Sequence, residues 1–304
     1  MTDMPERKPG SGPVQPRRSA LYVPGSNARA LEKSQRLAAD AVIIDLEDAV
    51  APGAKLAARL AAVEAAASGG FGGREVVIRV NGLDTAWGAD DIAAVAGSAA
   101  DAVLFPKIDD TASLHAAIGW LDRAGGSAMP VWVMAETPRS VLAIEAIASL
   151  APRVAVIVMG TADLAKALRL PPDPQRLGLL PALSHCVLAA RARGVDILDG
   201  IFAEFRNPSG FRDACRQGKA LGFDGKTLIH PDQIAAANEI FGVSADEAAA
   251  ASQLVAAWEA AAAADQGIAV LDGRMVERLH AEEARRILAL HQAVGERAAQ
   301  DRKT

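Results

Sequence analysis

The sequence predicts an α/β fold, a closed (β/α)8 TIM barrel of eight parallel strands with a C-terminal helical extension. Short runs rich in Val, Ile and Leu alternate with stretches of helical periodicity, and eight such pairs fit between residues 19 and 241. Strands separated by helices run parallel, and eight of them in about 250 residues is the size of a closed barrel. A doubly wound open sheet would show the same alternation, but the chain lacks the G-x-G-x-x-G turn of a dinucleotide-binding fold.

The elements follow one another in a regular order along the chain. Residues 1–17 hold four prolines without periodicity and are expected to form a disordered arm. The barrel domain is expected at residues 18–243, with strands at 19–23, 41–45, 75–80, 102–105, 131–135, 154–159, 196–202 and 226–229. Helical spacing follows each strand in turn, at 27–38, 55–67, 90–96, 112–124, 140–150, in stretches reaching 193, at 211–221 and at 233–241.

Residues 244–304 lie outside the barrel count and are expected to form the helical extension. Ser244 is a candidate N-cap for a helix over 245–264, and a turn at Asp272-Gly273 precedes a last helix over 277–299. An extension of this kind either covers the end of the barrel that carries the active site or reaches a neighbouring subunit.

Composition excludes several classes of partner. A formal net charge of -5 without a basic stripe argues against a protein that binds nucleic acid. Cys186 and Cys215 stand far apart, without the spacing of a zinc site or a disulfide scaffold. Because neither a signal-peptide core nor a run of about 18 apolar residues occurs, we expect a cytoplasmic protein without a membrane partner.

Two carboxylates follow neighbouring strands of the predicted barrel. The run 131–135 leads directly to Glu136, and the run 154–159 leads through Gly160 to Asp163. Neighbouring parallel strands end at the same rim, where two carboxylates, water and substrate oxygens would form the shell that Mg2+ prefers. Ordinary loop acids or helix N-cap groups are the alternative.

Charged residues also follow the second and third strands. Glu47 and Asp48 either cap the next helix or hold the waters of a cation. Arg79 lies within an apolar run, where an unpaired guanidinium would be costly, so we expect it to face a polar barrel mouth.

Three further positions at strand ends have more than one interpretation. Lys107 could form a Schiff base, but a salt bridge to an acid of the rim is favoured. His230 before Pro231 indicates packing or capping as readily as catalysis. Thr137-Pro138 forms a good N-cap and N1 pair, which predicts a helix N-terminus beside Glu136.

Several segments together carry a resemblance to a known family. They are Arg18-Ser19 with Tyr22-Val-Pro-Gly25, Ile44-Asp-Leu-Glu-Asp-Ala-Val50, Arg79-Val-Asn81, Phe105-Pro-Lys107, Glu136-Thr137, Gly160 with Asp163-Leu164, and Gly222-Phe-Asp-Gly-Lys226 with Ile229-His-Pro231. As a set, from Arg18 to about Arg286, they resemble the HpcH/HpaI aldolase/citrate lyase family, in particular its citrate lyase beta-subunit-like members and the related malyl-CoA and citramalyl-CoA lyases.

The resemblance implies a reaction and a set of site residues. Members cleave a 3-hydroxyacyl thioester reversibly into a 2-oxo acid and acetyl-CoA or an acetyl carrier. Glu136 and Asp163 would bind Mg2+, and through it the hydroxyl and carboxylate that become the 2-oxo acid. Arg79 would contact a substrate carboxylate or the thioester oxygen and stabilise the departing enolate. Glu47 and Asp48 would hold metal-bound waters.

The chain departs from the family pattern near its C-terminus. Relatives carry a Gly-x-Met-x-Asp turn whose aspartate a neighbouring subunit inserts over the site as acid or base, and here Glu277 follows Gly273-Arg-Met-Val276. Glu277 keeps the carboxylate, so we expect it to transfer the proton, in a homo-oligomer for which the resemblance favours a trimer. Ser140 replaces a common glycine, and an acidic residue is common near Asn207.

The leading hypothesis is therefore a Mg2+-dependent carbon-carbon lyase acting on a malyl-CoA or citramalyl-CoA type thioester. The alternatives are a citryl carrier-protein lyase subunit, a malyl-CoA thioesterase, and a non-catalytic ligand-binding homologue. Arg18 is assigned to substrate binding, and Arg18 and Arg29 are candidates for CoA phosphate contacts, although solvated surface charge is the simpler interpretation.

Overall fold

The structure is a computed structural model that describes residues 14–301, and the chain forms two compact units. One is Arg17–Asn238, and the other includes the residues from Glu239 onward, so that the division falls shortly before the boundary expected at residue 243. Of the disordered arm expected at 1–17, residues 1–13 lie outside the described residues. Arg17 belongs to the first unit, where it pairs with Glu75 at 2.7 Å and with Asp196.

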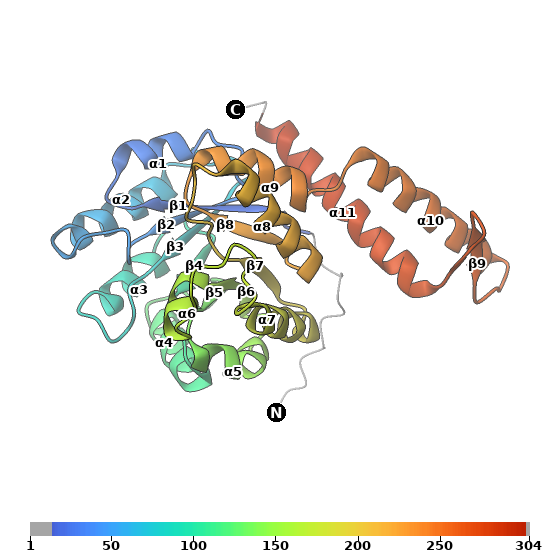
Figure 1. The fold of residues 1–304 in the computed structure, drawn as a ribbon. Helices are drawn as coiled ribbons and strands as arrows, with labels where there is room; N and C mark the ends of the chain where they lie inside the picture. Colours follow the sequence, from blue (N-terminus) through green and yellow to red (C-terminus); the bar gives the residue numbers. More distant parts are fainter. Residues whose placement is uncertain (1–13, 302–304) are drawn as a thin grey trace. The chain divides into compact units, whose positions relative to one another are not determined.

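The first unit is a closed barrel of eight parallel strands, as the sequence predicts (Figure 1). Each strand pairs with its neighbour along the chain, and β8 closes the ring on β1, with Ser19 opposite Lys226. The strands are β1 (Ser19–Pro24), β2 (Ala41–Asp45), β3 (Glu75–Arg79), β4 (Ala102–Phe105), β5 (Val131–Ala135), β6 (Val154–Met159), β7 (Asp196–Asp199) and β8 (Gly225–Leu228).

Helices surround the barrel on its outside. They are α1 (Ala28–Ser34), α2 (Lys55–Ala67), α3 (Gly88–Ala96), α4 (Thr111–Arg123), α5 (Pro138–Ala148), α6 (Thr161–Ala167), α7 (Leu180–Arg193), α8 (Pro208–Leu221) and α9 (Ile234–Phe241), with short 3-10 helices η1 (Pro52–Ala54) and η2 (Pro231–Gln233). The helical pattern expected up to residue 193 forms two helices, because a segment rich in proline separates α6 from α7.

Apolar side chains fill the inside of the barrel. Ala20, Ile43, Val77, Trp132 and Leu198 are fully buried there and pack against one another. Both faces of each strand are covered, one by this interior and one by the helices, which explains why the strands read as continuous apolar runs. The centre of the barrel is therefore a packed core, and space for a ligand remains at the ends of the strands.

Strand β7 is shorter than expected, since the sequence suggested residues 196–202 and the strand ends at Asp199. The carboxylate of Asp199 is buried against Lys226 of β8 at 2.7 Å and Arg176 at 2.7 Å. Gly200 then passes so close to the end of β6 that a Cβ atom there would lie 2.3 Å from Thr161 Oγ1. The chain leaves the sheet at this position, where only glycine fits.

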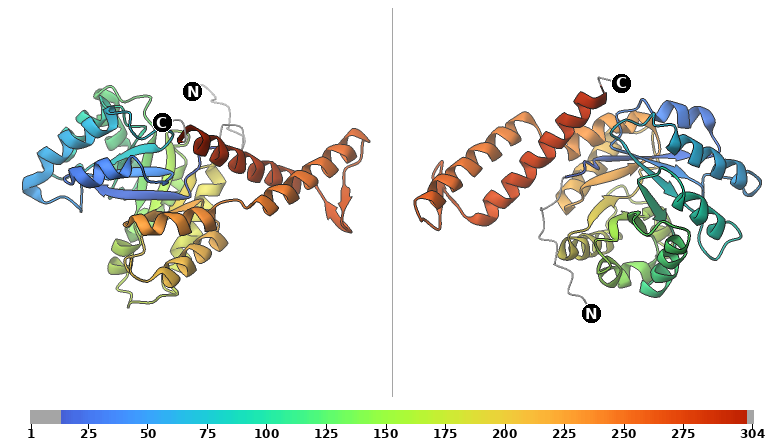
Figure 2. Two further views of the ribbon diagram at one scale, coloured as in Figure 1. Left: turned by 90° about the horizontal axis from the view of Figure 1, so that it is seen from above. Right: turned by 180° about the vertical axis from the view of Figure 1, so that it is seen from behind.

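The second unit contains a long helix pair and a small hairpin. Helices α10 (Ala245–Ala263) and α11 (Arg278–Asp301) pack side by side, and the hairpin of β9 (Ala269–Leu271) and β10 (Arg274–Val276) joins them at one end (Figure 2). Ser244 caps α10 in a capping box with Glu247, which confirms the predicted N-cap. Asp272 and Gly273 form the predicted turn, with φ of 49° and 74°. The two strands beside the turn were not predicted, because three residues are too few to show alternation in the sequence.

No helix within residues 14–301 has the length and apolar character needed to cross a membrane. Both cysteines, Cys186 of α7 and Cys215 of α8, are free and buried.

Candidate active site

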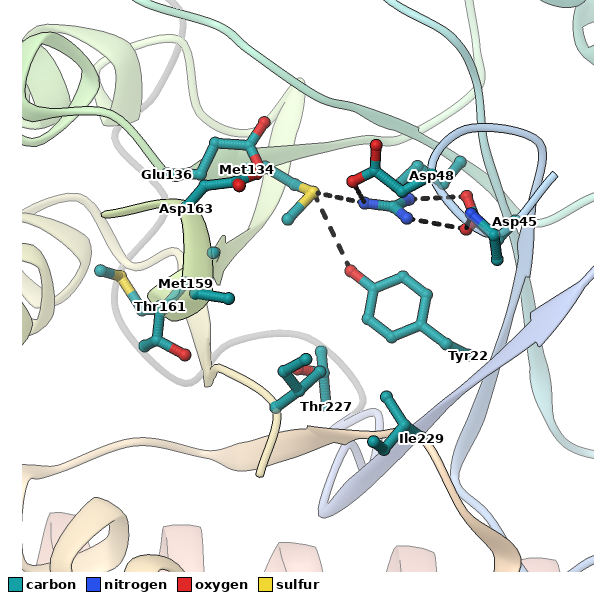
Figure 3. A pocket seen from close by; sticks show the side chains of 15 residues that line it. Tyr22, Asp45, Asp48, Met134, Glu136, Met159, Thr161, Asp163, Thr227 and Ile229 are labelled. Carbon is teal, nitrogen blue, oxygen red and sulfur yellow. Dashed lines mark hydrogen bonds and ion pairs between the residues drawn. The ribbon is translucent and has the colours of Figure 1, made fainter. Parts of the chain in front are cut away.

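A cavity of about 350 Å³ opens at the carboxyl ends of the barrel strands (Figure 3). Glu136 and Asp163 lie on one side of it, Asp45 and Asp48 lie on the other, and Met134 lies between them. The described lining residues all belong to the barrel unit: Tyr22, Asp45, Asp48, Ala49, Arg79, Met134, Glu136, Met159, Gly160, Thr161, Ala162, Asp163, Ile201, Thr227 and Ile229.

Glu136 and Asp163 come together as their positions after β5 and β6 predict. Glu136 is 2% exposed, and its Oε1 accepts a hydrogen bond of 2.7 Å from the backbone N–H of Lys107. Gly160 makes room for it, because a Cβ atom at Gly160 would lie 2.3 Å from the Cβ of Glu136. Asp163 lies in the first turn of α6 and faces the same cavity.

The electrostatics of this pair favour a bound cation. Burial raises the pKa of Glu136 to about 7, and the nearby carboxylates of Glu47 and Asp163 also act to raise it. A carboxylate that is buried beside other carboxylates loses hydration without gaining a counter-ion. A cation between Glu136 and Asp163 would remove that penalty.

The N-terminus of α5 holds the backbone on which Glu136 sits. Thr137 caps the helix through a 3.0 Å hydrogen bond from the Ser140 N–H, and Pro138 is the first helical residue, as predicted. The Ser140 hydroxyl accepts hydrogen bonds from the backbone N–H groups of Glu136 and Thr137 at 3.1 and 3.0 Å. The serine that departs from the family pattern thus has a local role, which is to fix the loop that carries Glu136.

The donor set fits Mg2+. The alternative that these two acids cap helices fails, because Thr137 caps α5 and the N-cap of α6 is Gly160. Within residues 14–301 there is no cluster of three or more His, Cys, Asp or Glu side chains that could enclose a metal ion. Mg2+ commonly takes one or two carboxylates and completes its shell with water and substrate oxygens, so two are sufficient.

Arg79 faces the polar barrel mouth, as predicted, and a neighbouring strand holds it in place. Its Nε and Nη2 each donate a hydrogen bond of 2.7 Å to the carboxylate of Asp45, the residue opposite it in the β2–β3 register. Asp45 is itself fixed by the backbone N–H groups of Glu47 and Ala49, at 2.8 and 3.0 Å. The third guanidinium nitrogen, Nη1, lies beside the cavity, 3.5 Å from Met134 Sδ and 2.9 Å from Glu47 Oε2.

Glu47 and Asp48 lie on the same rim as Arg79. Arg79 Nη1 is 2.9 Å from Glu47 Oε2 and 3.8 Å from Asp48 Oδ2. Neither acid caps the next helix, because the N-cap of η1 is Ala51 and no side chain caps it. Burial raises the pKa of Glu47, an effect that Arg79 opposes.

Lys107 forms the salt bridge that the sequence favoured. Its Nζ is 3.1 Å from Glu47 Oε1, and this carboxylate raises the pKa of Lys107 above its ordinary value. A lysine held protonated in this way is a poor Schiff-base nucleophile. Lys107 also has a left-handed backbone, with φ of 53°, which turns its N–H toward Glu136.

Lys55, which the sequence did not single out, braces the rim from outside. Its Nζ donates to the carbonyl oxygens of Leu46 and Glu47 and to Asn81 Oδ1, each at 2.7 Å. Asn81, one of the motif residues, also donates 2.6 Å to Asp91. These bonds fix the loop that carries Glu47 and Asp48.

The structure does not bring Arg18 to this cavity. Arg18 precedes the first residue of β1, at the amino end of the barrel, whereas the cavity lies at the carboxyl ends. Its guanidinium and its backbone N–H are bonded to the buried carboxylate of Asp40 at 2.7 to 2.9 Å. Arg18 thus ties β1 to the segment before β2. Arg29 lies exposed in α1.

Three further residues that the sequence singled out are not among the residues that line the cavity. His230 caps η2, where its Nδ1 accepts the N–H of Asp232 at 3.2 Å, which is the capping role that the sequence allowed. Lys226 is fully buried against Asp199 outside the barrel interior. Glu277 belongs to the second unit, between β10 and α11, and its backbone N–H donates 3.0 Å to His280 Nδ1.

Sequence reasoning missed two residues of the site. Asp45 was quoted only as part of a motif, although an acid and an arginine that both end neighbouring parallel strands are a signal for pairing. Tyr22 is the fourth of the six residues of β1 and lines the cavity. Alternation along β1 would have placed its ring on the inner face, together with Ala20.

Comparison with known proteins adds three findings. The profile of the family described as HpcH/HpaI aldolase/citrate lyase matches residues 18–231. A (3S)-malyl-CoA thioesterase of Cereibacter sphaeroides is 46% identical over 281 residues, which are 92% of this chain and 96% of that protein. An L-malyl-CoA/beta-methylmalyl-CoA lyase of the same species is 35% identical over 290 residues, covering 87% and 91%.

Among solved structures, the protein CitE from Mycobacterium tuberculosis in complex with magnesium, acetoacetate and coenzyme A is similar. The two chains align with a TM-score of 0.71 and 28% identity, covering 90% of this chain and 97% of CitE. A citrate lyase from Burkholderia xenovorans, at 19% identity and a TM-score of 0.79, shares the fold.

Proposed function

The chain belongs to the HpcH/HpaI aldolase/citrate lyase family, and on that premise we propose that it is a Mg2+-dependent enzyme that hydrolyses a malyl-CoA-type thioester. The observation that carries the choice of reaction is 46% identity, over nearly the whole chain, to a malyl-CoA thioesterase. The sequence alone placed carbon-carbon cleavage first and hydrolysis among the alternatives. We place hydrolysis first because of the thioesterase, and cleavage is the second candidate because a malyl-CoA lyase is 35% identical.

The cavity supports a substrate with a polar acid end and a thioester. Glu136 and Asp163 would hold Mg2+, which when bound polarises the oxygens that it contacts, here the hydroxyl and carboxylate of the malyl group. On the other side of the cavity Arg79 presents Nη1 toward the thioester. Met134, Met159, Ile201 and Ile229 form an apolar lining around these polar groups.

Both candidate reactions place negative charge on the thioester oxygen. In hydrolysis, water adds to the carbonyl carbon, the C–S bond breaks, and the CoA thiol leaves with a proton. In cleavage, the hydroxyl loses its proton, the C2–C3 bond breaks, and the charge moves onto the enolate of acetyl-CoA. Arg79 can stabilise either anion, so the products must decide between them.

The deciding experiment identifies those products. Purified protein with Mg2+ and (3S)-malyl-CoA is expected to release free CoA and malate, measured by a thiol reagent and by chromatography. Formation of acetyl-CoA and glyoxylate would establish cleavage instead. A chelator should stop either reaction. Failure of malyl-, citramalyl- and citryl-CoA to yield any product in the presence of Mg2+ would overturn both reactions, and a carrier-linked citryl substrate would then separate the carrier-protein lyase from the non-catalytic alternative.

We further propose that Glu277 transfers a proton in this reaction and that the protein is a homo-oligomer, with a trimer favoured, in which a neighbouring subunit supplies it. Glu277→Ala is expected to lower kcat by about 100-fold, because proton transfer by a positioned side chain contributes on that order. Binding of malate with Mg2+, measured by calorimetry, should be retained.

The matched variant is Glu277→Asp, which restores the residue common in the family and should keep activity within about tenfold of wild type. Glu277→Gln should resemble the alanine variant. If Glu277→Ala kept its full kcat, the proton would have to be transferred by another group.

A further inference from the structure

Tyr22, the only tyrosine of the chain, presents its hydroxyl to the cavity. Its ring packs on the inner face of the barrel and lies against the guanidinium of Arg79, with 4.9 Å between Cζ and the ring centroid. Among the described residues, the hydroxyl finds its hydrogen-bond partner in Met134 Sδ, at 3.9 Å. A thioether is a weak acceptor, and a phenol inside a protein normally has a stronger one.

A second donor points at the same sulfur atom. Arg79 Nη1 lies 3.5 Å from Met134 Sδ, so a phenol O–H and a guanidinium N–H converge on one position beside the cavity (Figure 3). Met134 has an unbranched, flexible side chain that can give way to a ligand. Two donors aimed at one weak acceptor form a ready site for a single oxygen atom.

The charge around this position selects the kind of oxygen. Arg79 and Lys107 carry positive charge, and Asp45, Glu47 and Asp48 carry negative charge within the same hydrogen-bonded group. With Lys55 beside the same acids, three acids stand against three bases, and the group holds no excess positive charge for a permanent carboxylate. A carbonyl oxygen, which becomes negative only during the reaction, suits it better.

The hydroxyl keeps its proton over the working range of pH. Burial raises the pKa of Tyr22 above its ordinary value, and the positive charge of Arg79 opposes this only in part. Tyr22 is therefore a hydrogen-bond donor and not a base.

We propose that Tyr22 is a catalytic residue whose hydroxyl, together with Arg79 Nη1, donates a hydrogen bond to the thioester carbonyl oxygen of the substrate. This inference rests on the proposed function and names the group that the rim beside Arg79 recognises. As water adds to the carbonyl carbon, the C=O electron pair moves onto the oxygen between the two donors. When the C=O bond re-forms the C–S bond breaks, and Tyr22 retains its proton throughout.

The first test is Tyr22→Phe, which keeps the ring and its contact with Arg79. We expect kcat to fall by about 100-fold, the effect of removing one donor to an oxyanion, with KM unchanged within about threefold. The melting temperature should stay at the wild-type value, because the hydrogen bond that is lost in the free protein is weak. An unchanged kcat overturns the proposal, and so does a rise in KM alone, since that would indicate a ground-state contact with a carboxylate.

The second test does not depend on turnover. Protein labelled with tyrosine carrying 13C at the ring carbon that bears the hydroxyl gives one resonance, because the chain has one tyrosine. With Mg2+ present, propionyl-CoA should shift this resonance, whereas S-propyl-CoA, a thioether without the carbonyl oxygen, and malate should leave it in place. A response to the thioether or to malate, or no response to propionyl-CoA, overturns the proposal.

The two experiments separate this inference from the proposed function. If the wild-type protein released no product from malyl-CoA while propionyl-CoA alone shifted the resonance, the proposed reaction would be wrong and the donor assignment would stand. If wild type and Tyr22→Phe turned over malyl-CoA at the same rate, the proposed function would stand and the donor assignment of Tyr22 would be wrong.

Discussion

Glu136→Gln is expected to abolish Mg2+-dependent turnover and to leave the barrel folded. Glutamine keeps the size of the side chain and an acceptor for the Lys107 N–H, but it removes the charge that a hard cation requires. Loss of an outer partner of a metal site costs about 10- to 100-fold in affinity, so loss of a direct ligand should cost about 100-fold or more. Calorimetric titration with Mg2+ measures the affinity, and circular dichroism monitors the fold.

Two further variants make this result specific. Asp163→Asn should weaken Mg2+ binding in the same way, because Asp163 faces the same cavity. Asp213→Asn removes an equal charge from an exposed ion pair with Arg216 on α8 and should leave the titration unchanged. Unchanged Mg2+ affinity in both Glu136→Gln and Asp163→Asn would overturn the metal assignment.

The raised pKa of Glu136 gives this prediction a pH dependence. With a pKa of about 7, a proton competes with Mg2+ below neutral pH, and the affinity should fall about tenfold between pH 8 and pH 6. In the metal-free protein the folded state holds a proton that the unfolded chain releases near pH 4.5, so the free energy of unfolding should decrease as pH rises toward 7. Glu136→Gln should lose this decrease, because the amide does not titrate.

The fold could be predicted from the sequence because strand order and direction follow from alternation alone. Eight apolar runs separated by helices leave few arrangements, and the closed barrel is one of them. What alternation does not give is where a strand ends. Strand β7 stops at Asp199, and Gly200 then lies close to Thr161 at the start of α6, a contact between distant segments that no local pattern reveals.

The site could be predicted in part, for the same reason. Residues that directly follow parallel strands share one rim, so Glu136, Asp163 and Arg79 came together as expected. The partners that hold them were missed, because pairing of Arg79 with Asp45 depends on register between strands. Arg18 was assigned to substrate binding, but it does not lie at the rim. It precedes β1, and a residue before a strand lies at the opposite end of the barrel.

Arg79→Lys is expected to lower kcat by about 100- to 1,000-fold, the cost of removing one donor to a developing oxyanion. Asp45 occupies Nε and Nη2 of Arg79 at 2.7 Å each, and Nη1, which lies 2.9 Å from Glu47, has a second N–H that can serve the substrate. A lysine has one ammonium group on a flexible stem, which cannot pair with Asp45 in this forked geometry and reach the cavity at the same time. Steady-state kinetics with malyl-CoA measure kcat and KM separately.

Stability must be distinguished from catalysis in this variant, because Arg79 is buried among acids. Arg59 offers a matched control, since it forms a 2.7 Å ion pair with the buried Asp91, also between neighbouring elements of the barrel unit. Arg59→Lys and Arg79→Lys should lower the melting temperature by similar amounts, and only Arg79→Lys should lower kcat.

Asp45→Asn keeps the guanidinium of Arg79 but holds it less firmly. This variant should lower kcat by about tenfold, which is less than the effect of replacing the guanidinium in Arg79→Lys. A wild-type kcat with a raised KM in Arg79→Lys would mean that Arg79 binds the substrate equally in its ground and transition states, and stabilisation of the thioester oxyanion would then have to come from another group.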